Sequence, residues 1–148
     1  MRDVMNATEQ LVRDAANGDA AALDWLVKFN TYAHALDDLV DEDRGWPRVV
    51  ALPGLLRDVV QHPFYLRNGA ALSLVLELVE VHYVTSAVWE RDGREGRQRM
   101  ADVLRCCGNL VVSAVAIITG GRELAQRLTA PLWEESWAVH HDADGKAI

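Results

Sequence analysis

The chain has 148 residues, of which half are apolar and a quarter charged, and its formal net charge is −7 at pH 7. This composition is typical of a globular domain with a hydrophobic core and excludes a largely disordered or low-complexity protein. The acidic balance also argues against a nucleic-acid partner, because binding phosphates requires a basic surface.

The first residues and the apolar stretches predict where the protein resides. The segment MRDVMNATEQLVRD carries charges throughout and lacks the apolar region of a secretion signal. The longest nearly unbroken apolar run, LVVSAVAII at 110–118, has about half the length that a membrane span needs. We therefore expect a cytoplasmic protein with no membrane partner. Cys106 and Cys107 are adjacent and point apart on a helix, so we expect two reduced thiols.

Two helices are predicted in the first third of the chain. The first covers about residues 8–17 and ends at Gly18, a residue type favoured just after a helix. Asp19 then caps a longer helix, since an aspartate before an apolar run accepts hydrogen bonds from free N–H groups. This helix ends at Gly45, ahead of the Trp46-Pro47 step that disfavours helical backbone.

The middle of the chain contains a short helix and a long apolar one. A helix is possible at about 49–61, with Pro53 near its start or breaking it. The segment HPFYLRNG is expected to form a turn or an irregular helix entry. The next segment, about residues 68–90, is apolar almost all round, which indicates a central helix. RDGREG, at 91–96, is predicted to be a loop.

Two further helices complete the prediction. One covers about 97–119 and is closed by Gly120-Gly121, and the last covers about 122–141, with a kink or division at Pro131. Residues 141–148 are expected to form a frayed tail. Because no strand-like alternation is sustained anywhere, we predict a single all-α domain over the whole chain. It would be a bundle of about four main helices with shorter pieces attached.

The end of the second predicted helix concentrates negative charge. Five carboxylates fall within seven positions: Asp37, Asp38, Asp41, Glu42 and Asp43. Helix C-termini favour cations, and like charges one turn apart repel, so this arrangement costs free energy. A bound Mg²⁺ would offset that cost, because it takes a few carboxylates, several waters and the phosphate oxygens of a substrate. The alternative is a solvated helix end whose carboxylates pair with nearby arginines.

The central helix offers a second set of carboxylates. Glu77 and Glu80 share one narrow stripe of an otherwise apolar helix. A buried glutamate is costly unless it is paired, protonated or bound to a metal. If this stripe faces Asp38 and Asp41, four carboxylates converge on one or two cations. Alternatively, Glu77 and Glu80 simply lie on the exposed face of the helix.

A competing polar set lies on roughly the opposite side of the central helix. It consists of His82, Ser86 and Glu90, and His34 of the second helix is the histidine that could join it. The structural interpretation is a core histidine that hydrogen-bonds to Ser86 or to a backbone carbonyl. The functional interpretation is a polar cluster within the bundle.

Arginines are concentrated in the loop after the central helix. Arg94, Arg97 and Arg99 lead into the start of the next helix, whose free N–H groups favour anions. They are candidates for binding the phosphates of a nucleotide ligand. The alternative is a solvated hinge loop.

The paired carboxylates carry a resemblance to a known family. DLVD (Asp38, Asp41) and ELVE (Glu77, Glu80) resemble the Mg²⁺-binding pairs of the all-α NTP pyrophosphatases, the MazG-like and dimeric dUTPase group. The resemblance covers roughly residues 20–90. This sequence departs from the family pattern with aspartates in the first pair, Glu80 in place of an aspartate, and a longer segment between the pairs. The resemblance implies an all-α fold, a magnesium site and hydrolysis of a nucleotide diphosphate linkage.

Two functional hypotheses follow. The first is a Mg²⁺-dependent hydrolase of a nucleotide-like diphosphate that works as a homodimer. Its metal ligands would be Asp37, Asp38, Asp41, Glu77 and Glu80, with Glu77 or Glu80 also serving as catalytic base. The second is a non-catalytic helical adaptor or oligomer subunit. The C-terminal segment LWEESWAVHH brings tryptophans that suit either a protein interface or the core.

Overall fold

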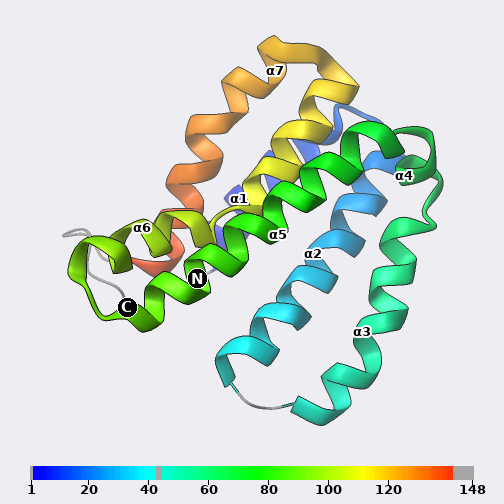
Figure 1. Ribbon diagram of the computed structural model, residues 1–148. Coiled ribbons are helices and arrows are strands. Elements are labelled where there is room, and N and C mark those ends of the chain that lie inside the picture. Colours follow the sequence, from blue (N-terminus) through cyan, green and yellow to red (C-terminus); the bar gives the residue numbers. More distant parts are fainter. Residues whose placement is uncertain (1, 43–44, 142–148) are drawn as a thin grey trace.

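The computed structural model describes residues 2–42 and 45–141, with side chains for residues 8–40, 50–139 and 141. Within these ranges the chain forms seven helices and no strand, so the predicted all-α class is confirmed (Figure 1). The number of main helices is larger than predicted, since five exceed the short α4 and α6 in length. The helices are α1 (Arg2–Ala16), α2 (Ala20–Glu42), α3 (Gly45–Val60), α4 (Pro63–Arg67), α5 (Gly69–Asp92), α6 (Glu95–Arg105) and α7 (Gly108–His140).

The turn between α1 and α2 has the predicted chemistry. Asn17 and Gly18 both adopt positive φ angles, of 49° and 81°, which ends α1. Asp19 Oδ1 then accepts hydrogen bonds from the N–H groups of Ala21 and Ala22, at 2.9 and 3.0 Å. These are two of the N–H groups that a helix start leaves without partners, so the expected Asp19 cap is confirmed.

The prolines of the segment between α2 and α5 lie within helices. The prediction that Pro53 lies near the start of a helix or breaks it is wrong. Pro53 lies inside α3 and the helix continues through it. His62 caps α4, because its Nδ1 accepts a hydrogen bond from the Phe64 N–H at 3.1 Å, and Pro63 occupies the first helical position. Proline suits that position because its missing N–H would have no helical partner there. The expected irregular helix entry is thus the single turn of α4.

The predicted helix over 97–119 is wrong, because the chain breaks at Cys106 and Cys107. The N–H groups of these cysteines bond to carbonyls three residues earlier, which makes a tight turn between α6 and α7. Gly108, the first residue of α7, follows at once. This turn lets α6 return along α5 while α7 enters the core. Its position is therefore determined by tertiary packing, and no local sequence signal was strong enough to predict it.

Helix α7 folds back on itself into two limbs, as Figure 1 shows by its yellow and orange halves. The reversal is at Gly121, whose φ of 84° and ψ of −178° are accessible to glycine alone at low cost. The predicted closure at Gly120-Gly121 is therefore confirmed. Pro131 lies within the second limb and does not divide it.

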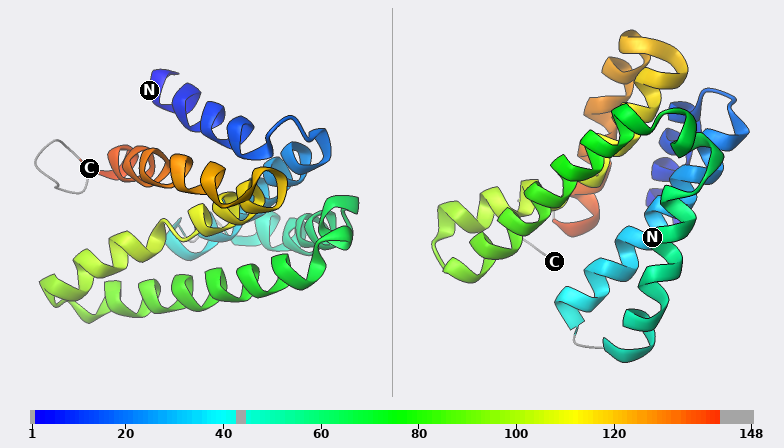
Figure 2. Two further views of the ribbon diagram at one scale, coloured as in Figure 1. Left: turned by 90° about the horizontal axis from the view of Figure 1, so that it is seen from above. Right: turned by 45° about the vertical axis from the view of Figure 1, so that its right-hand side comes forward.

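The helices pack mainly in antiparallel pairs: α1 with α7, α2 with α3 and α5 with α6, while α5 also packs on α7 (Figure 2). Side-chain hydrogen bonds fix the first pair. Asn17 Nδ2 donates to the Thr119 carbonyl at 3.0 Å, and Thr119 Oγ1 donates to the Ala15 carbonyl at 2.7 Å. Toward their free ends the α2/α3 and α5/α6 pairs diverge, as both Figure 1 and Figure 2 show.

The main hydrophobic core lies where these pairs meet. Trp25 of α2 is fully buried, and its indole Nε1 donates to the Val59 carbonyl at 3.0 Å. The Trp25 ring packs against Phe29 and Phe64 at centroid distances of 5.9 and 5.8 Å. Leu72, Val111 and Val115 bring α5 and α7 into the same cluster. Burying these large aromatic rings removes much apolar surface from water and so stabilises the fold.

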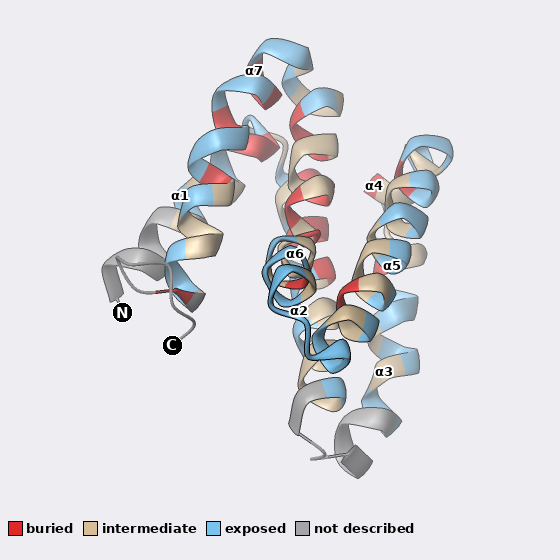
Figure 3. Ribbon diagram, turned by 60° about the vertical axis from the view of Figure 1, so that its left-hand side comes forward, coloured by how far each residue is buried: buried red, intermediate tan, exposed pale blue. Residues whose placement is uncertain are grey.

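The outer side of α5 is apolar and uncovered, as the exposed surface of this helix in Figure 3 illustrates. By length and composition, Gly69–Asp92 and a stretch within Glu95–Val139 could each cross a membrane. Only 11% of the first stretch and 28% of the second are buried inside the protein. An apolar helix normally hides its side chains in a core, so α5 leaves an unusual amount of apolar surface uncovered.

Candidate functional site

A cluster of polar side chains joins α2, α5 and α6 at the end remote from Trp25. Its members are Asp37 of α2, Tyr83 and Glu90 of α5, and Arg105 of α6; we refer to them as the Arg105 cluster. The Tyr83 hydroxyl donates to Asp37 Oδ1 at 2.9 Å. Arg105 donates to a Glu90 carboxylate oxygen, and its Nη1 lies 3.6 Å from Asp37 Oδ1. The Arg105 guanidinium carbon lies 5.8 Å from the Tyr83 ring centroid.

Burial makes Arg105 the centre of this cluster. Its side chain is 19% exposed, whereas those of Asp37 and Glu90 are about half exposed. One guanidinium can hold two carboxylates because its donors form a planar fork. Arg105 also ends α6, where a cation is favoured by the helix dipole. The arrangement neutralises carboxylates from two helices and ties three helices together.

The acid-rich end of α2 is only partly described. Asp38 is half-buried and takes part in interactions of its own. Asp41 and Glu42 belong to α2, but their side chains lie outside the described ones, and Asp43 lies outside the described residues altogether. For Asp37, the pairing with Arg105 matches the alternative of a helix end that pairs with arginines.

Glu77 and Glu80 are both exposed on α5. Burial raises the pKa of the Tyr32 phenol of α2, and the negative charge of Glu80 raises it further. Among the described side chains, no hydrogen bond or ion pair joins either glutamate to Asp37. Nor is any group of three or more histidine, cysteine, aspartate or glutamate side chains placed there to hold a metal ion. The site of four carboxylates remains a prediction.

The competing polar set does not form a single cluster in the described residues. His82 donates through Nδ1 to the Leu78 carbonyl at 2.6 Å, within its own helix. Ser86 is fully buried and donates to the Tyr83 carbonyl at 2.6 Å. Glu90 pairs with Arg105, and His34 is exposed on α2. These histidine and serine contacts match the structural interpretation, in which backbone carbonyls satisfy the polar groups.

The loop arginines hold carboxylates of their own segment. Arg94 and Arg97 both bond to Asp92, and the Arg94 hydrogen bond is the main reason that the pKa of Asp92 falls to about 2. Arg99 bonds to Glu95, one turn earlier in α6, at 2.6 Å. Arg94 and Arg97 therefore pair across the α5–α6 turn, whereas Arg99 pairs within α6. A phosphate would have to compete with these carboxylates, and phosphate binding here stays a prediction.

The end of the C-terminal limb of α7 contacts α6 through His141, the residue that follows this helix. The rings of Trp137 and His141 stack at 3.5 Å with an interplanar angle of 2°. His141 is buried, and its Nε2 lies 3.4 Å from an Asp102 carboxylate oxygen. Trp133 and Trp137 are half-buried, so they share in the packing and keep an exposed edge. The frayed tail was expected to begin at residue 141, and only residues 142–148 lie outside the described part.

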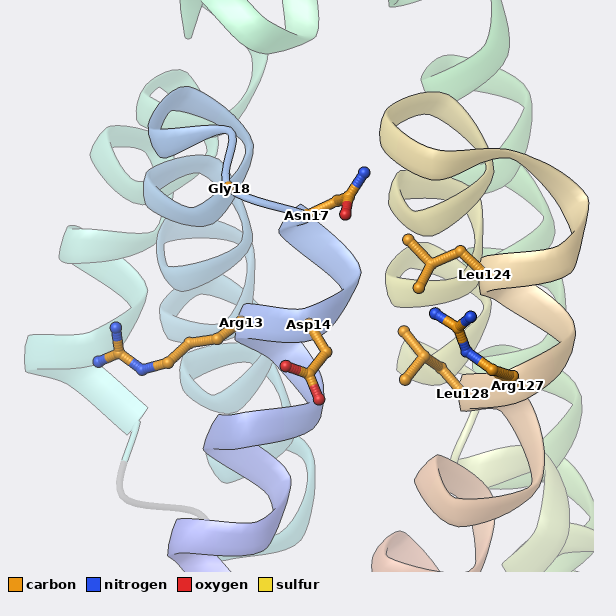
Figure 4. Close-up of a pocket in the computed structure, with 7 residues that line it drawn as sticks. All are labelled: Arg13, Asp14, Asn17, Gly18, Leu124, Arg127 and Leu128. Atoms are coloured by element: carbon orange, nitrogen blue, oxygen red, sulfur yellow. The ribbon is translucent and has the colours of Figure 1, made fainter.

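One surface pocket of about 350 Å³ lies between α1 and the second limb of α7 (Figure 4). Its polar side chains are engaged locally: Asp14 accepts from Gln10 at 2.8 Å, and Arg13 pairs with Glu9 at 2.6 Å. In Figure 4 the Arg13 side chain points away from Leu124, while Arg127 points into the gap. The pocket is remote from the Arg105 cluster and gathers no convergent set of polar groups, so we assign no site to it.

Two members of the Arg105 cluster were missed by sequence reasoning. Tyr83 stands seven residues before Glu90, two helical turns, so the shared face was a usable signal. Arg105 gave no such signal, because its position beside Asp37 depends on the return of α6 along α5. The ion pair of Asp24 with Lys28 and His62 was also missed, although HPF is a recognisable helix start.

Protein-family models, curated proteins and solved structures were all compared with the chain, and none of them matches it.

Proposed function

We propose that the protein is a non-catalytic helical interaction module and that one face of α5 is its contact surface. We name this surface the α5 outer face. Its apolar members are between 44% and 60% exposed and lie three or four residues apart: Leu74, Leu78, Val81, Val84 and Val88. Residues at this spacing line one side of a helix, so they form a continuous stripe. Scattered exposed apolar residues are ordinary, whereas a contiguous stripe is typical of a surface that binds something.

The charges on α5 favour a protein partner over a bilayer. Glu77 and Glu80 lie near the middle of the helix, between Leu74 and Val84. If α5 spanned a membrane, both carboxylates would lie near the bilayer centre, where a charge costs several kcal/mol. At a protein interface the same groups can lie at a solvated rim or meet a cation.

Site-specific crosslinking tests the proposal. A photoreactive amino acid would replace Val81 in one variant and Leu66 of α4 in another, and light would be applied in the cells that make the protein. The two positions are matched, since these side chains are 58% and 66% exposed. We expect covalent adducts from position 81 and none from position 66. If position 81 gives no more adducts than position 66, the α5 outer face is not a contact surface and the proposal is wrong.

A Mg²⁺-dependent hydrolase of a nucleotide-like diphosphate is the second candidate. The observation that favours it is that Asp37 and Glu90, from different helices, meet at one guanidinium, with Asp38 next to Asp37 in the sequence. A metal could replace the Arg105 charge there and bridge phosphate oxygens, with a bound water as nucleophile. The resemblance of DLVD and ELVE to the NTP pyrophosphatases points to Glu77 and Glu80 instead as the second pair of ligands.

Thermal melts with Mg²⁺ or Mn²⁺ against chelator test this candidate. A ligand of the native state at a hundred times its dissociation constant adds about 2.7 kcal/mol, which raises Tm by several degrees. If the metal binds at the Arg105 cluster, Asp37→Asn/Asp38→Asn should abolish the metal-induced rise in Tm and Glu77→Gln/Glu80→Gln should keep it. If the metal binds between the four predicted carboxylates, both double variants should abolish the rise in Tm. If the wild-type protein shows no shift at millimolar metal, the hydrolase candidate is eliminated.

A further inference from the structure

We infer that the occupant of the α5 outer face is a second copy of this chain, docked with its α5 antiparallel to the first. This inference rests on the proposed function and names the partner. A seam that runs along this face beside Leu78 follows alternating steps of three and four residues through Leu74, Glu77, Val81, Val84, Val88 and Arg91. That alternation is the spacing of the seam between two coiled helices, in which side chains of one helix fill gaps in the other.

The two charged positions of the stripe determine the orientation. Glu77 lies in the first half of the seam and Arg91 at its last position, and both are exposed. Neither makes an ion pair with any described residue of its own chain. A parallel arrangement of two copies would set glutamate against glutamate and arginine against arginine. An antiparallel arrangement brings opposite charges together at both ends, so the charge pattern of the face complements itself.

The register follows from a two-fold axis midway between Val81 and Val84. Val81 of one copy then faces Val84 of the other, and the reverse contact is equivalent by symmetry. Glu77 faces Val88 of the second copy and lies one turn from Arg91 of that copy. The apolar residues would fill the centre of the contact, and the two ion pairs would close its ends.

The size of the face limits the strength of the dimer. From residue 74 to residue 91 a helix extends roughly 25 Å. A single helix pair of this length buries less than the roughly 800 Å² per partner of a standard stable interface. We therefore expect a reversible dimer with a dissociation constant in the micromolar range, so that both species are present at ordinary concentrations.

Sedimentation equilibrium over micromolar to millimolar protein tests the inference. The wild-type chain should change from monomer to dimer as concentration rises. Val81→Glu should weaken the dimer on the order of a hundredfold or more, because it places two unpaired carboxylates in the apolar centre. Leu66→Glu, at an exposed position of α4, is the matched control and should leave the dissociation constant unchanged. Circular dichroism would check that each variant remains folded.

Charge reversal tests the antiparallel register. Glu77→Arg alone, and Arg91→Glu alone, should each weaken the dimer on the order of tenfold, because symmetry removes two ion pairs and creates two like-charge contacts. Glu77→Arg/Arg91→Glu should restore wild-type affinity. A dimer that the double variant fails to restore would overturn the antiparallel pairing.

Two further outcomes would overturn the second copy as partner. One is a wild-type chain that stays monomeric throughout the concentration range. The other is binding to phosphatidylcholine vesicles that Val81→Glu abolishes, which would assign the face to a lipid surface. In either case, crosslinks from position 81 to a different protein would leave the interaction module standing. If position 81 gives no adducts at all, both the interaction module and the dimer are excluded.

Discussion

The two ends of α2 are held in place by different physical interactions. At one end, Trp25 is fully buried among aromatic rings and contributes its one polar group to a backbone carbonyl. At the other end, Asp37 reaches α5 and α6 through a hydroxyl and a guanidinium, and much of it remains exposed. Apolar burial is strong and insensitive to salt, whereas partly exposed charge pairs are weak and screened. The difference indicates a rigid end and an end that can open.

Trp25→Ala should have the largest effect, because it removes an aromatic ring from the rigid end. We expect a loss of about 3–5 kcal/mol in the free energy of unfolding, from lost burial and the cavity that remains. Urea denaturation followed by circular dichroism would measure it. Trp133→Ala is a suitable control, since its side chain is only half-buried and should cost clearly less. Equal losses in the two variants would contradict the assignment of the core to Trp25.

Arg105→Met should have the next largest effect, at the end that can open. It removes the guanidinium from Asp37 and Glu90 and leaves them facing each other across the cluster. Because both carboxylates are about half exposed, we expect a loss of only about 1–2 kcal/mol. Hydrogen exchange should accelerate in α6 and the second half of α5, and remain unchanged around Trp25. Arg99→Met, which removes an exposed ion pair, should change neither the free energy of unfolding nor the exchange rates. If Arg105→Met accelerates exchange uniformly over the chain, the two ends of α2 are not independent.

Tyr83→Phe should have a smaller effect, because it keeps the ring and removes the hydroxyl that donates to Asp37. We expect a loss of about 0.5–1.5 kcal/mol. The double variant Tyr83→Phe/Arg105→Met should lose less free energy of unfolding than the sum of the two single losses, since both groups contact the same carboxylate. Strict additivity in urea denaturation would mean that the cluster does not act as a unit.

The smallest effect is expected at Asp24, near the rigid end. Its hydrogen bonds with Lys28 and then His62 lower the pKa of this carboxyl below its usual 3.8. A lowered folded-state pKa stabilises the protein above the unfolded pKa, and this contribution disappears as the pH falls through the folded value. Asp24→Asn should therefore cost less than about 1 kcal/mol near neutral pH, and the cost should vanish in acid. Denaturation midpoints at several pH values would show it, and a pH-independent difference would exclude this cause.

Local sequence signals predicted the parts of this fold that short stretches determine. The Asp19 cap and the Gly120-Gly121 closure each depend on a few neighbouring residues, and both are present in the structure. The turn at Cys106 and Cys107 could not be predicted in the same way, because it results from the packing of α6 on α5. A continuous helix would have satisfied the same backbone groups locally.

The candidate site shows the same division. The acid-rich end of α2 was recognisable, because a run of carboxylates at a helix C-terminus is unfavourable unless something compensates it. Its compensating partner was not recognisable, since Arg105 lies far away in the chain and reaches Asp37 only through the α5–α6 turn. Glu77 and Glu80 gave a regular spacing, and spacing alone does not say which side of a helix meets its neighbours. The exposed position of Glu77 results from the way α5 packs on α6 and α7.

The pairing of α1 with α7 has a consequence for how the chain folds during synthesis. Asn17 and Thr119, which hydrogen-bond to each other, are separated by 102 positions. At a translation rate of about 5–20 residues per second, α1 leaves the ribosome roughly 5–20 s before its partner exists. During that interval α2 can cover part of its apolar side, but the α7 surface on which it mainly packs is missing. Slower translation would lengthen the time for which this surface of α1 stays exposed.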